Sequence, residues 1–520
     1  MALNALDWLA CSSFIFVLGV IGHRLRRQNR SHSLPSGPPQ KPLIGNYLDV
    51  PKAEPWKTFS QWGKLYGDLV YVKVLGNKLL ILNDLESMRE LLEKRSQKYS
   101  DRPSFVMAKY MGIENNLSFA PYGPDWRRGR KLIHGTVNQE AVQKYHSLQE
   151  NVAARFLRDL VEYPSEVMKH LHMATAQIIA SITYGFSIDT PNNVYFDEFA
   201  ETERIVLKSV VPGAYLVDMI PLLWYLPSWV PFNSIQRTAE RGRQRVSDIV
   251  HHPMEQVEQD MKQGASSASF VSDHLREGGS DKVIRQQLPW VAWSIYEGIS
   301  GIWVYLTVQK TSGTMLVFMH AMACFPEVQT RMREEIHRVV GTDRLPSFDD
   351  RGRLPYINAA IKEVYRWKPN SPLGAPRKLQ DADVYRGYYI PKGTTVMPNT
   401  WLLSRDQDSG IDPEAFSPER FLDTHVEKTA LDPYSYAFGF GRRMCPGRFL
   451  ADNSVFMLVT SIVATMRISK PKDSHGMEKP FDPPYIPAGL VSFPYPFEVD
   501  IEPVSDKAVA VVKGIATSID

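Results

Sequence analysis

Residues 438–451 constrain what this chain can fold into more than any other segment. They read Phe-Gly-Phe-Gly-Arg-Arg-Met-Cys-Pro-Gly-Arg-Phe-Leu-Ala, which places Cys445 between a glycine-rich turn and a helical run. Gly439 and Gly441 allow the backbone to turn tightly, and Pro446 favours the start of a helix. We therefore expect Cys445 beside a helix N-terminus, where amide N–H groups and the helix dipole stabilise a thiolate.

The three cysteines of the chain limit what that thiolate can do. Cys11, Cys324 and Cys445 are widely separated and odd in number, which argues against a disulfide framework and against a paired-cysteine zinc site. One thiolate with no second Cys or His nearby suits an axial bond to haem iron better than tetrahedral zinc. The alternative is a buried, unreactive cysteine in a glycine-rich turn.

Five positions of this segment resemble the haem-binding signature of the cytochrome P450 family: Phe438, Gly441, Arg443, Cys445 and Gly447. The resemblance implies haem b as cofactor, with Cys445 as the iron ligand. It also implies the family's fold, which is mainly α with a smaller β portion. The amino-acid sequence as a whole is most similar to fungal members of the family that act in secondary metabolism.

A second resemblance concerns an ion-paired cluster that supports the haem from below. Glu363 and Arg366 resemble the ExxR helix of the family, and residues 418–421, Pro-Glu-Arg-Phe, resemble the loop whose arginine joins the cluster. The spacing alone is uninformative, because it also occurs at Glu86/Arg89, Glu201/Arg204, Glu240/Arg243 and Glu335/Arg338. Only the order of helix, loop and cysteine segment selects Glu363.

Four residues resemble the family's partners of the haem propionates. Trp126 and Arg130 stand four residues apart, on one face of an expected helix. Arg377 follows Ala375-Pro376, and Arg443 lies in the cysteine segment; fork-shaped guanidinium donors suit carboxylates. The alternative for Trp126 and Arg130 is an ordinary surface pair.

The resemblance fails on the helix that crosses the distal haem face. The family carries an acid and an alcohol there, which help to deliver protons during oxygen activation. Counting from residues 325–329 puts these positions at Gln309 and Lys310, whereas counting from residues 290–296 puts them eight residues earlier. Eight extra residues lengthen a helix by about 12 Å and rotate its downstream face by about 80°. Thr311 is the candidate catalytic residue that remains, with Thr307 and Lys310 as alternatives.

Three explanations fit the altered stretch, residues 299–310. A wrong splice boundary in the gene would translate intron sequence locally. A true variant would oxidise without the usual proton relay, as in radical coupling, desaturation or isomerisation. Loss of oxygen activation would leave a non-catalytic haem-binding protein. Sequencing the transcript across codons 290–326 separates the first explanation from the other two.

The beginning of the chain predicts one transmembrane helix followed by a hinge. Residues 1–23 are mostly apolar and long enough to cross a hydrocarbon core. Residues 24–46 are basic and then proline-rich, and the arginines directly after the apolar run place the main body in the cytosol. We expect a single-pass protein of the endoplasmic reticulum membrane. A cleaved signal peptide is the alternative, but such peptides carry their basic residues before the apolar run.

Composition excludes several other classes of protein. Of the 520 residues, 43% are hydrophobic and 22% are charged, with a net charge of +3, which argues against disorder, a multi-span membrane protein and nucleic-acid binding. We expect one catalytic domain at residues 47–504 and a flexible tail at 505–520. Helical patterns cover residues 141–162, 166–184, 311–340 and 355–368, and hairpin patterns cover residues 69–82 and 383–396.

Residues 211–232 are unusually apolar for a connection and contain four prolines. This stretch is expected to dip into the bilayer surface, to roof a pocket, or to form a buried loop between core helices.

Together these features predict a haem-thiolate monooxygenase that uses O2 and takes electrons from NADPH through NADPH–cytochrome P450 reductase. Arg442, Arg443 and Arg448 would attract an acidic face of the reductase. Family geometry suggests substrate contacts at residues 105–117, 210–215, 373 and 488–491. Their apolar character favours a hydrophobic small molecule such as a terpenoid, meroterpenoid or prenylated aromatic.

Overall fold

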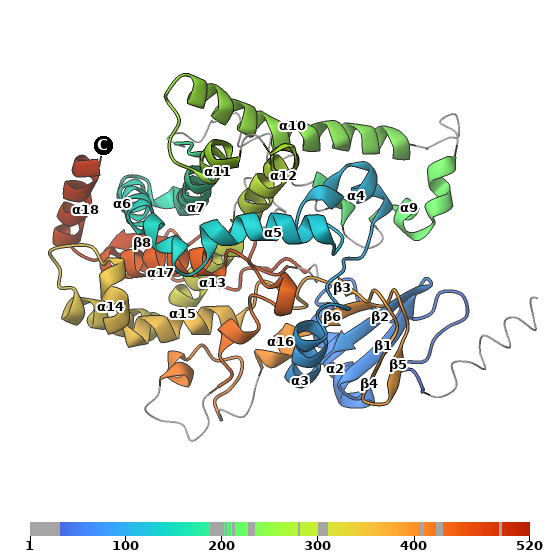
Figure 1. Cartoon of the computed structure of the whole chain (residues 1–520). Coiled ribbons are helices and arrows are strands. Elements are labelled where there is room, and N and C mark those ends of the chain that lie inside the picture. The colour runs from blue at the N-terminus through green and yellow to red at the C-terminus, as the bar shows by residue number, and fades with distance from the viewer. Residues whose placement is uncertain are drawn as a thin grey trace, which may run out of the picture.

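The computed structural model describes residues 32–519 (Figure 1). It leaves out residues 188–201, 203–204, 207, 211–213, 227–233, 279–280, 300–309, 406–409, 423–429 and 488–490. The predicted anchor, residues 1–23, lies outside the described residues, as does the first part of the hinge. Within the described part, no helix is both long and apolar enough to cross a membrane.

The chain is mainly helical with small sheets, as the sequence predicts. The helices of the first half are α2 (Pro55–Tyr66), α3 (Leu85–Arg89), α4 (Val106–Tyr110), α5 (Pro124–Val137), α6 (His146–Glu162), α7 (Val167–Tyr184), α9 (Leu216–Met219) and α10 (Ile235–Lys262). Those of the second half are α11 (Phe270–Gly278), α12 (Lys282–Ile299), α13 (Lys310–Cys324), α14 (Pro326–Val339), α15 (Pro355–Trp367), α16 (Thr400–Leu403), α17 (Arg448–Thr465) and α18 (Asp506–Ile519).

The strands are β1 (Leu69–Val74), β2 (Asn77–Leu82), β3 (Arg377–Lys378), β4 (Asp383–Tyr385), β5 (Tyr388–Ile390), β6 (Thr395–Pro398), β7 (Met466–Ser469) and β8 (Asp500–Pro503). Strands β1 to β6 gather at one end of the molecule, at the lower right of Figure 1, whereas β7 and β8 form a separate pair near α17 on the other side. The largest sheet has the order β1-β2-β6-β3, and β7 pairs with β8. The hairpin predicted at residues 69–82 is confirmed. The second predicted hairpin is confirmed for β4 and β5 only, because β6 pairs in parallel with β2 instead.

Helices of the main body surround one large apolar core, and two smaller cores lie against the sheet. The helices predicted at residues 166–184 and 355–368 are confirmed. The run predicted at residues 311–340 is broken between α13 and α14 at Phe325. Pro326 explains the break, because proline has no N–H to donate and is favoured at the first position of a new helix.

The predicted flexible tail is a helix along most of its length. Residues 506–519 form α18, which packs against α6 and α17. Val512 is fully buried and Ala508 nearly so, while Lys513 faces solvent. The sequence prediction was wrong here, because a short apolar stripe among small residues is enough to dock a terminal helix on an existing core.

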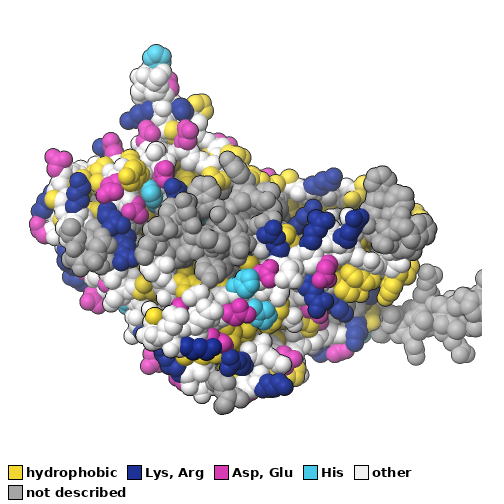
Figure 2. Space-filling view, turned by 90° about the horizontal axis from the view of Figure 1, so that it is seen from above, with side chains coloured by type: hydrophobic (Ala, Val, Ile, Leu, Met, Phe, Trp, Pro, Cys, Tyr) yellow, Lys and Arg dark blue, Asp and Glu magenta, His cyan; other side chains and the backbone are white. Residues whose placement is uncertain are grey.

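The apolar connection, residues 211–232, is described only for residues 214–226. Here α9 and a short helix at Pro221–Tyr225 expose large hydrophobic side chains, with Leu222 and Tyr225 each 77% accessible. Figure 2 looks down on the face that carries α10 and shows yellow hydrophobic patches among Lys and Arg side chains. A fully buried loop, one of the three predicted alternatives, is therefore wrong for the described part.

Candidate functional site

The cysteine segment adopts the tight turn that its glycines predict. Gly439 and Gly441 both have positive φ, at 77° and 53°, in the region that favours glycine. The amide of Cys445 donates to the carbonyl of Phe438 at 2.9 Å and closes the loop. Helix α17 begins at Arg448, so Cys445 lies just before a helix N-terminus, as predicted.

The loop is held against a π-helical turn at Glu90–Lys94. A Cβ atom on Gly441 would lie 2.1 Å from the carbonyl oxygen of Leu92, a distance that a side chain cannot adopt. Glycine at this position therefore fixes how closely the cysteine loop approaches the body of the protein.

Four arginines form a basic cluster beside this loop, which we call the arginine cluster: Arg102, Arg130, Arg377 and Arg443. Arg130 donates to the carbonyl of Met444, next to the cysteine, at 2.5 Å. Arg377 donates to Phe440 at 2.8 Å, and Arg443 donates to Ser100, Leu117 and Ala120. The sequence predicted three of these arginines for one site, and the structure brings those three together.

The charges of the arginine cluster are not balanced by carboxylates. Among the described residues, none of the four guanidinium groups forms an ion pair. Asp101 is the one described carboxylate whose charge stabilises the protonated form of Arg102 and Arg443. Burial lowers the pKa of Arg443 to about 8, and the charge of Arg102 adds to this effect. Burial also lowers the pKa of Arg377, followed by repulsion from its three arginine neighbours. An anion is needed here to neutralise the cluster.

Arg377 shows where that anion would bind. Its side chain is 96% buried, and its Nε and Nη1 atoms have no partner in the described structure. Buried donors are almost always satisfied in native proteins. Two unsatisfied guanidinium nitrogens within a positively charged cluster fit the carboxylates of a haem, so the arginine cluster and Cys445 together form a donor set suited to that cofactor.

Trp126 lies in the same cluster, on the buried face of α5. Its Nε1 donates to the carbonyl of Leu117 at 3.2 Å, and the Arg443 guanidinium lies 4.4 Å from its ring centroid. A Cβ atom on Gly129 would approach a methyl group of Leu117 to 2.8 Å, so Gly129 lets α5 pack closely here. The alternative of an exposed Trp126/Arg130 pair is wrong, because Trp126 is buried.

Arg102, the fourth member of the arginine cluster, was not predicted from the sequence. Its guanidinium donates to Ser118, Ala375 and Pro376, and so joins the segment before α5 to the segment before β3. Arg102 belongs to no motif that the sequence resemblance used. Its position directly after Asp101 and before Pro103 gave only a weak turn signal.

The ion-paired cluster predicted around Glu363 is confirmed. Glu363 is fully buried and accepts from Arg366 at 2.6 and 2.8 Å and from Arg420 at 3.3 Å. The amide of Ser417 adds a 2.7 Å bond, and Arg366 also donates to Ser404, Pro413 and Ala415. Among the other ExxR pairs, Glu86 instead pairs with Arg386. Glu335 accepts from the first amides of α15 and keeps only a long 3.9 Å ion pair with the exposed Arg338. The order of motifs therefore selected the right glutamate.

The distal motif positions, residues 301–302 and 309, lie outside the described residues. On the described flanks, α12 ends at Ile299 and α13 begins at Lys310. Thr311, the candidate catalytic residue, is 2% exposed, and its hydroxyl has no partner among the described groups. One turn later, Thr314 accepts from Asn370 at 2.7 Å.

The predicted substrate segments are divided between two places. Met107, Met111, Ile113 and Val210 are buried in the large core near α12. Leu373 packs instead in the small core between α2 and the sheet. Residues 211–213 and 488–490 lie outside the described residues. The neighbouring Phe493 packs on Gly313 of α13, where a Cβ atom would lie 3.1 Å from its ring.

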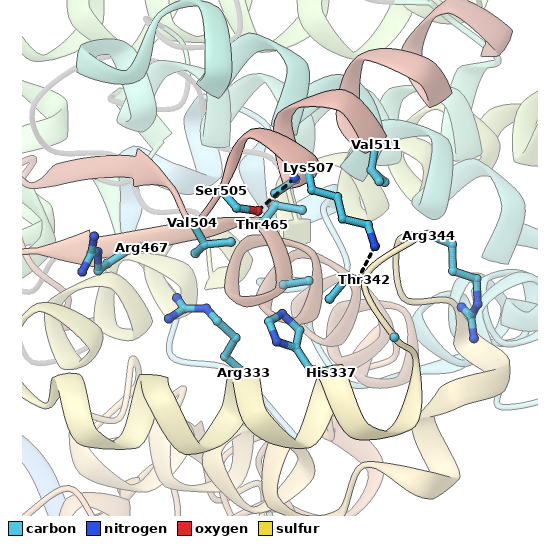
Figure 3. A pocket seen from close by; sticks show the side chains of 13 residues that line it. Arg333, His337, Thr342, Arg344, Thr465, Arg467, Val504, Ser505, Lys507 and Val511 are labelled. Atoms are coloured by element: carbon cyan, nitrogen blue, oxygen red, sulfur yellow. Dashed lines mark hydrogen bonds between the residues drawn. The ribbon is translucent and has the colours of Figure 1, made fainter.

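Two surface pockets are formed by described residues. One, of about 460 Å³, is lined by residues including Phe438, Arg448, Phe449 and Asp452, and so lies on the outer side of the cysteine loop. The other, of about 320 Å³, lies between α14 and α18 and is lined by Arg333, His337 and Lys507 (Figure 3). It contains none of the predicted site residues.

The predicted role of Arg443 toward a protein partner is wrong. Its side chain is buried, and each of its three guanidinium nitrogens donates to a backbone carbonyl. Arg442 is exposed and bonded to the hydroxyl of Tyr122, while Arg448 lies over the ring of Phe449 at 4.2 Å and lines the 460 Å³ pocket. Only these two arginines remain available for surface contacts.

Comparison with known proteins agrees with the geometry. Residues 35–500 match the Cytochrome P450 family. Cytochrome P450 monooxygenase COX2 of Coprinopsis cinerea is 37% identical over 500 residues, covering 95% of this chain and 93% of the relative. Cytochrome P450 monooxygenase claR of Ampulloclitocybe clavipes is 35% identical over 508 residues, covering 96% and 91%. The multifunctional cytochrome P450 monooxygenase af510 of Aspergillus fumigatus is 33% identical over 526 residues, covering 98% and 95%.

Proposed function

The chain belongs to the cytochrome P450 family and is a cytochrome P450 monooxygenase, and on that premise we propose that it oxidises a hydrophobic natural-product intermediate in fungal secondary metabolism. The family implies a haem-thiolate cofactor, a reductase partner and a small-molecule substrate. A terpenoid, meroterpenoid or prenylated aromatic fits best, because the buried side chains of the predicted substrate segments, which include Met107, Met111, Ile113 and Val210, are apolar.

The observation that carries the proposal is the pairing of Cys445 with the arginine cluster. Arg377 and Arg443 would hold the two propionates, and Arg130 and Trp126 would complete their surroundings from α5. When bound, haem supplies the iron that activates O2, and thiolate donation to that iron favours O–O cleavage. The chain itself contributes the thiolate, the neutralising charges and a loop that Gly439 and Gly441 hold in one shape.

Thr311 is the proposed hydrogen-bond donor on the distal side. Its hydroxyl is buried and unengaged on the first described turn of α13, so it can donate to a water molecule or substrate without breaking an existing bond. Proton delivery needs such a donor, and a hydroxyl that is already paired would have to be released first. In this proposal Thr311 moves the proton that the acid and alcohol of the family usually move.

The 460 Å³ pocket is the proposed contact for the electron donor, NADPH–cytochrome P450 reductase. It reaches Phe438 of the cysteine loop. Arg351 on its wall is ion-paired with Asp452, so Arg448 supplies the unbalanced positive charge. An acidic partner surface would be attracted to this face, with Arg442 exposed nearby. The short path from the pocket to Cys445 makes it a suitable entry point for electrons.

We also propose that residues 1–23 anchor the protein in the endoplasmic reticulum membrane, with the catalytic domain in the cytosol. The exposed apolar side chains of α9 and Pro221–Tyr225 support this, because they would otherwise face water. They would rest on the bilayer surface, from which a hydrophobic substrate can enter.

The proposed function is tested by reconstituting the full chain with a fungal NADPH–cytochrome P450 reductase in microsomes. We expect NADPH-dependent and O2-dependent conversion of at least one compound in a panel of terpenoids and prenylated aromatics, detected as a mass increase of one oxygen. Haem incorporation without any O2-dependent product from the panel would contradict the proposed substrate class. Product formation without NADPH would instead indicate isomerisation.

A further inference from the structure

The pocket of about 320 Å³ between α14 and α18 has basic side chains on its walls (Figure 3). Arg333 and His337 come from α14, Arg344 from the loop after it, Arg467 from β7 and Lys507 from α18. No carboxylate of the described residues lines the pocket. Because the charged groups on its walls all have the same sign, the pocket attracts anions.

Arg333 is held in one position at the side of this pocket. Its Nε donates to the carbonyl of Val463 at 3.0 Å, and its Nη2 donates to the carbonyl of Met466 at 2.8 Å and to the side chain of Gln329 at 3.2 Å. Its Nη1 has no hydrogen-bond partner among the described residues, and no described carboxylate pairs with it. The guanidinium group is therefore fixed in place with donor capacity left for a ligand.

The basic groups of the pocket repel one another. Burial lowers the pKa of Arg333, and the charge of Arg467 adds to this effect. Burial also lowers the pKa of His337, and the charge of Arg333 lowers it further. Arg344 is the exception, because the buried Asp350 neutralises its charge. An anion bound among Arg333, His337 and Arg467 would relieve their repulsion.

Arg467 and Lys507 can turn toward such an anion at little cost. Arg467 pairs with Glu502 at 2.9 Å, and Lys507 pairs with Asp343 at 2.7 Å. All four side chains are more than half exposed, and exposed ion pairs of this kind contribute little to stability. Both cations therefore remain available to a ligand that carries more than one negative charge.

The rest of the pocket is apolar and depends on the end of the chain. Val504, Ala508 and Val511 line it together with Ala464, so an organic group can pack against them. These three C-terminal residues lie after residues 35–500, the part of the chain that matches the cytochrome P450 family. The pocket is therefore built in part by a segment outside the family match.

We propose that this pocket binds a small organic phosphate, with Arg333, Arg467 and Lys507 around the phosphate and the organic part against Val504 and Val511. A phosphate group suits several converging cations better than a carboxylate does, because it carries more negative charge and has three acceptor oxygens. The bound molecule joins α14, β7 and α18, and so holds the terminal helix in place. The inference goes beyond the proposed function, because the pocket contains none of the haem-site residues.

The test is calorimetric titration of the purified full-length holoenzyme with phenyl phosphate at constant ionic strength. We expect saturable binding of one molecule per chain. Lys507→Gln and Arg467→Gln should each weaken this binding about tenfold, because each removes one charge-assisted hydrogen bond. Both residues are exposed, so both variants should fold. Hydrogen exchange at the amides of residues 506–512 should slow when phenyl phosphate is bound.

Lys392→Gln is the matched control. Lys392 is also an exposed lysine in an ion pair, with Asp381, but it lies on the loop between β5 and β6. Its removal should leave the affinity for phenyl phosphate unchanged. Unchanged affinity in both pocket variants, an equal loss in Lys392→Gln, or the absence of saturable binding would overturn the inference.

Benzoate tests the chemical class of the ligand. It has the same ring but one negative charge, and it should bind about tenfold more weakly than phenyl phosphate. If benzoate bound as tightly, and lost affinity in Lys507→Gln as phenyl phosphate does, the assignment to a phosphate would be wrong.

Discussion

The two sides of the candidate haem site are held by different kinds of contact. On the proximal side, the cysteine loop, Glu363 and the arginine cluster are joined by ion pairs and by many bonds from guanidinium groups to backbone carbonyls. On the distal side, α12 and α13 pack mainly through apolar side chains, and Thr311 keeps an unengaged hydroxyl. Many directional bonds on the proximal side indicate a rigid support for the cofactor. Apolar packing and a free hydroxyl on the distal side indicate a surface that can adapt to a substrate and pass a proton.

The largest effect should come from breaking the proximal support at Glu363. Replacing Glu363 by Ala leaves Arg366 and Arg420 buried without their carboxylate, which should destabilise the protein by about 3–5 kcal/mol and abolish haem binding. Thermal unfolding and haem content measure this. Glu86→Ala is the control, because Glu86 has the same ExxR spacing but forms an exposed pair, and it should cost at most about 1 kcal/mol.

The arginine cluster should show opposite effects on haem binding and on the stability of the haem-free chain. Arg377→Met removes a buried charge that repels its neighbours, so the unfolding midpoint of the haem-free protein should stay unchanged or rise. Haem affinity, measured by titration, should fall about 10–100-fold. Arg386→Met, at an exposed ion-paired site, should leave haem affinity unchanged. A large loss of haem-free stability in Arg377→Met would contradict the role assigned to this residue.

The ion-paired cluster around Glu363 and the arginine cluster also show how much of the site could be predicted from the sequence. Short motifs and their order along the chain identified Cys445, Glu363 and Arg420, because a loop and a helix turn place the residues of each motif within a few positions of one another. Arg102 could not be found this way, because its partners lie on the segments at 118 and 375–376 and only the fold brings them together. The docking of α18 depends likewise on a surface that α6 and α17 provide.

On the distal side, the next largest effect should come from a hydrogen bond that joins α13 to the C-terminal segment. The Nδ1 atom of His320 and the hydroxyl of Tyr485 share a hydrogen bond at 2.8 Å inside an aromatic cage. Burial lowers the pKa of His320 to about 4, and the charge of Lys368 adds to this, while Asp482 opposes it.

The unfolded chain therefore binds a proton at His320 before the folded chain does, and stability falls as the pH drops below 6.5 toward 4. The loss between pH 7 and pH 5 should be about 2 kcal/mol. Urea unfolding at both pH values should show this loss in the wild type and a smaller one in His320→Gln. The exposed His475→Gln should keep the wild-type difference, and an unchanged difference in His320→Gln would refute the assignment.

The smallest expected effect separates two hydroxyls one turn apart on α13. Thr311→Ala should reduce product formed per NADPH consumed about tenfold, or about 1.4 kcal/mol in the activation free energy, without changing haem content. Thr314→Val removes a hydroxyl that already accepts from Asn370 and should leave this ratio near the wild-type value. Equal losses in both variants would show that the unengaged hydroxyl of Thr311 has no special role.

The most direct test of the central claim is the carbon monoxide difference spectrum of the reduced protein with each described cysteine replaced in turn. We expect the wild type and Cys324→Ala to show the long-wavelength Soret band of thiolate-ligated haem and Cys445→Ala to lack it. A thiolate-type band that persists in Cys445→Ala, or one that disappears in Cys324→Ala alone, would contradict the assignment of Cys445 as the iron ligand.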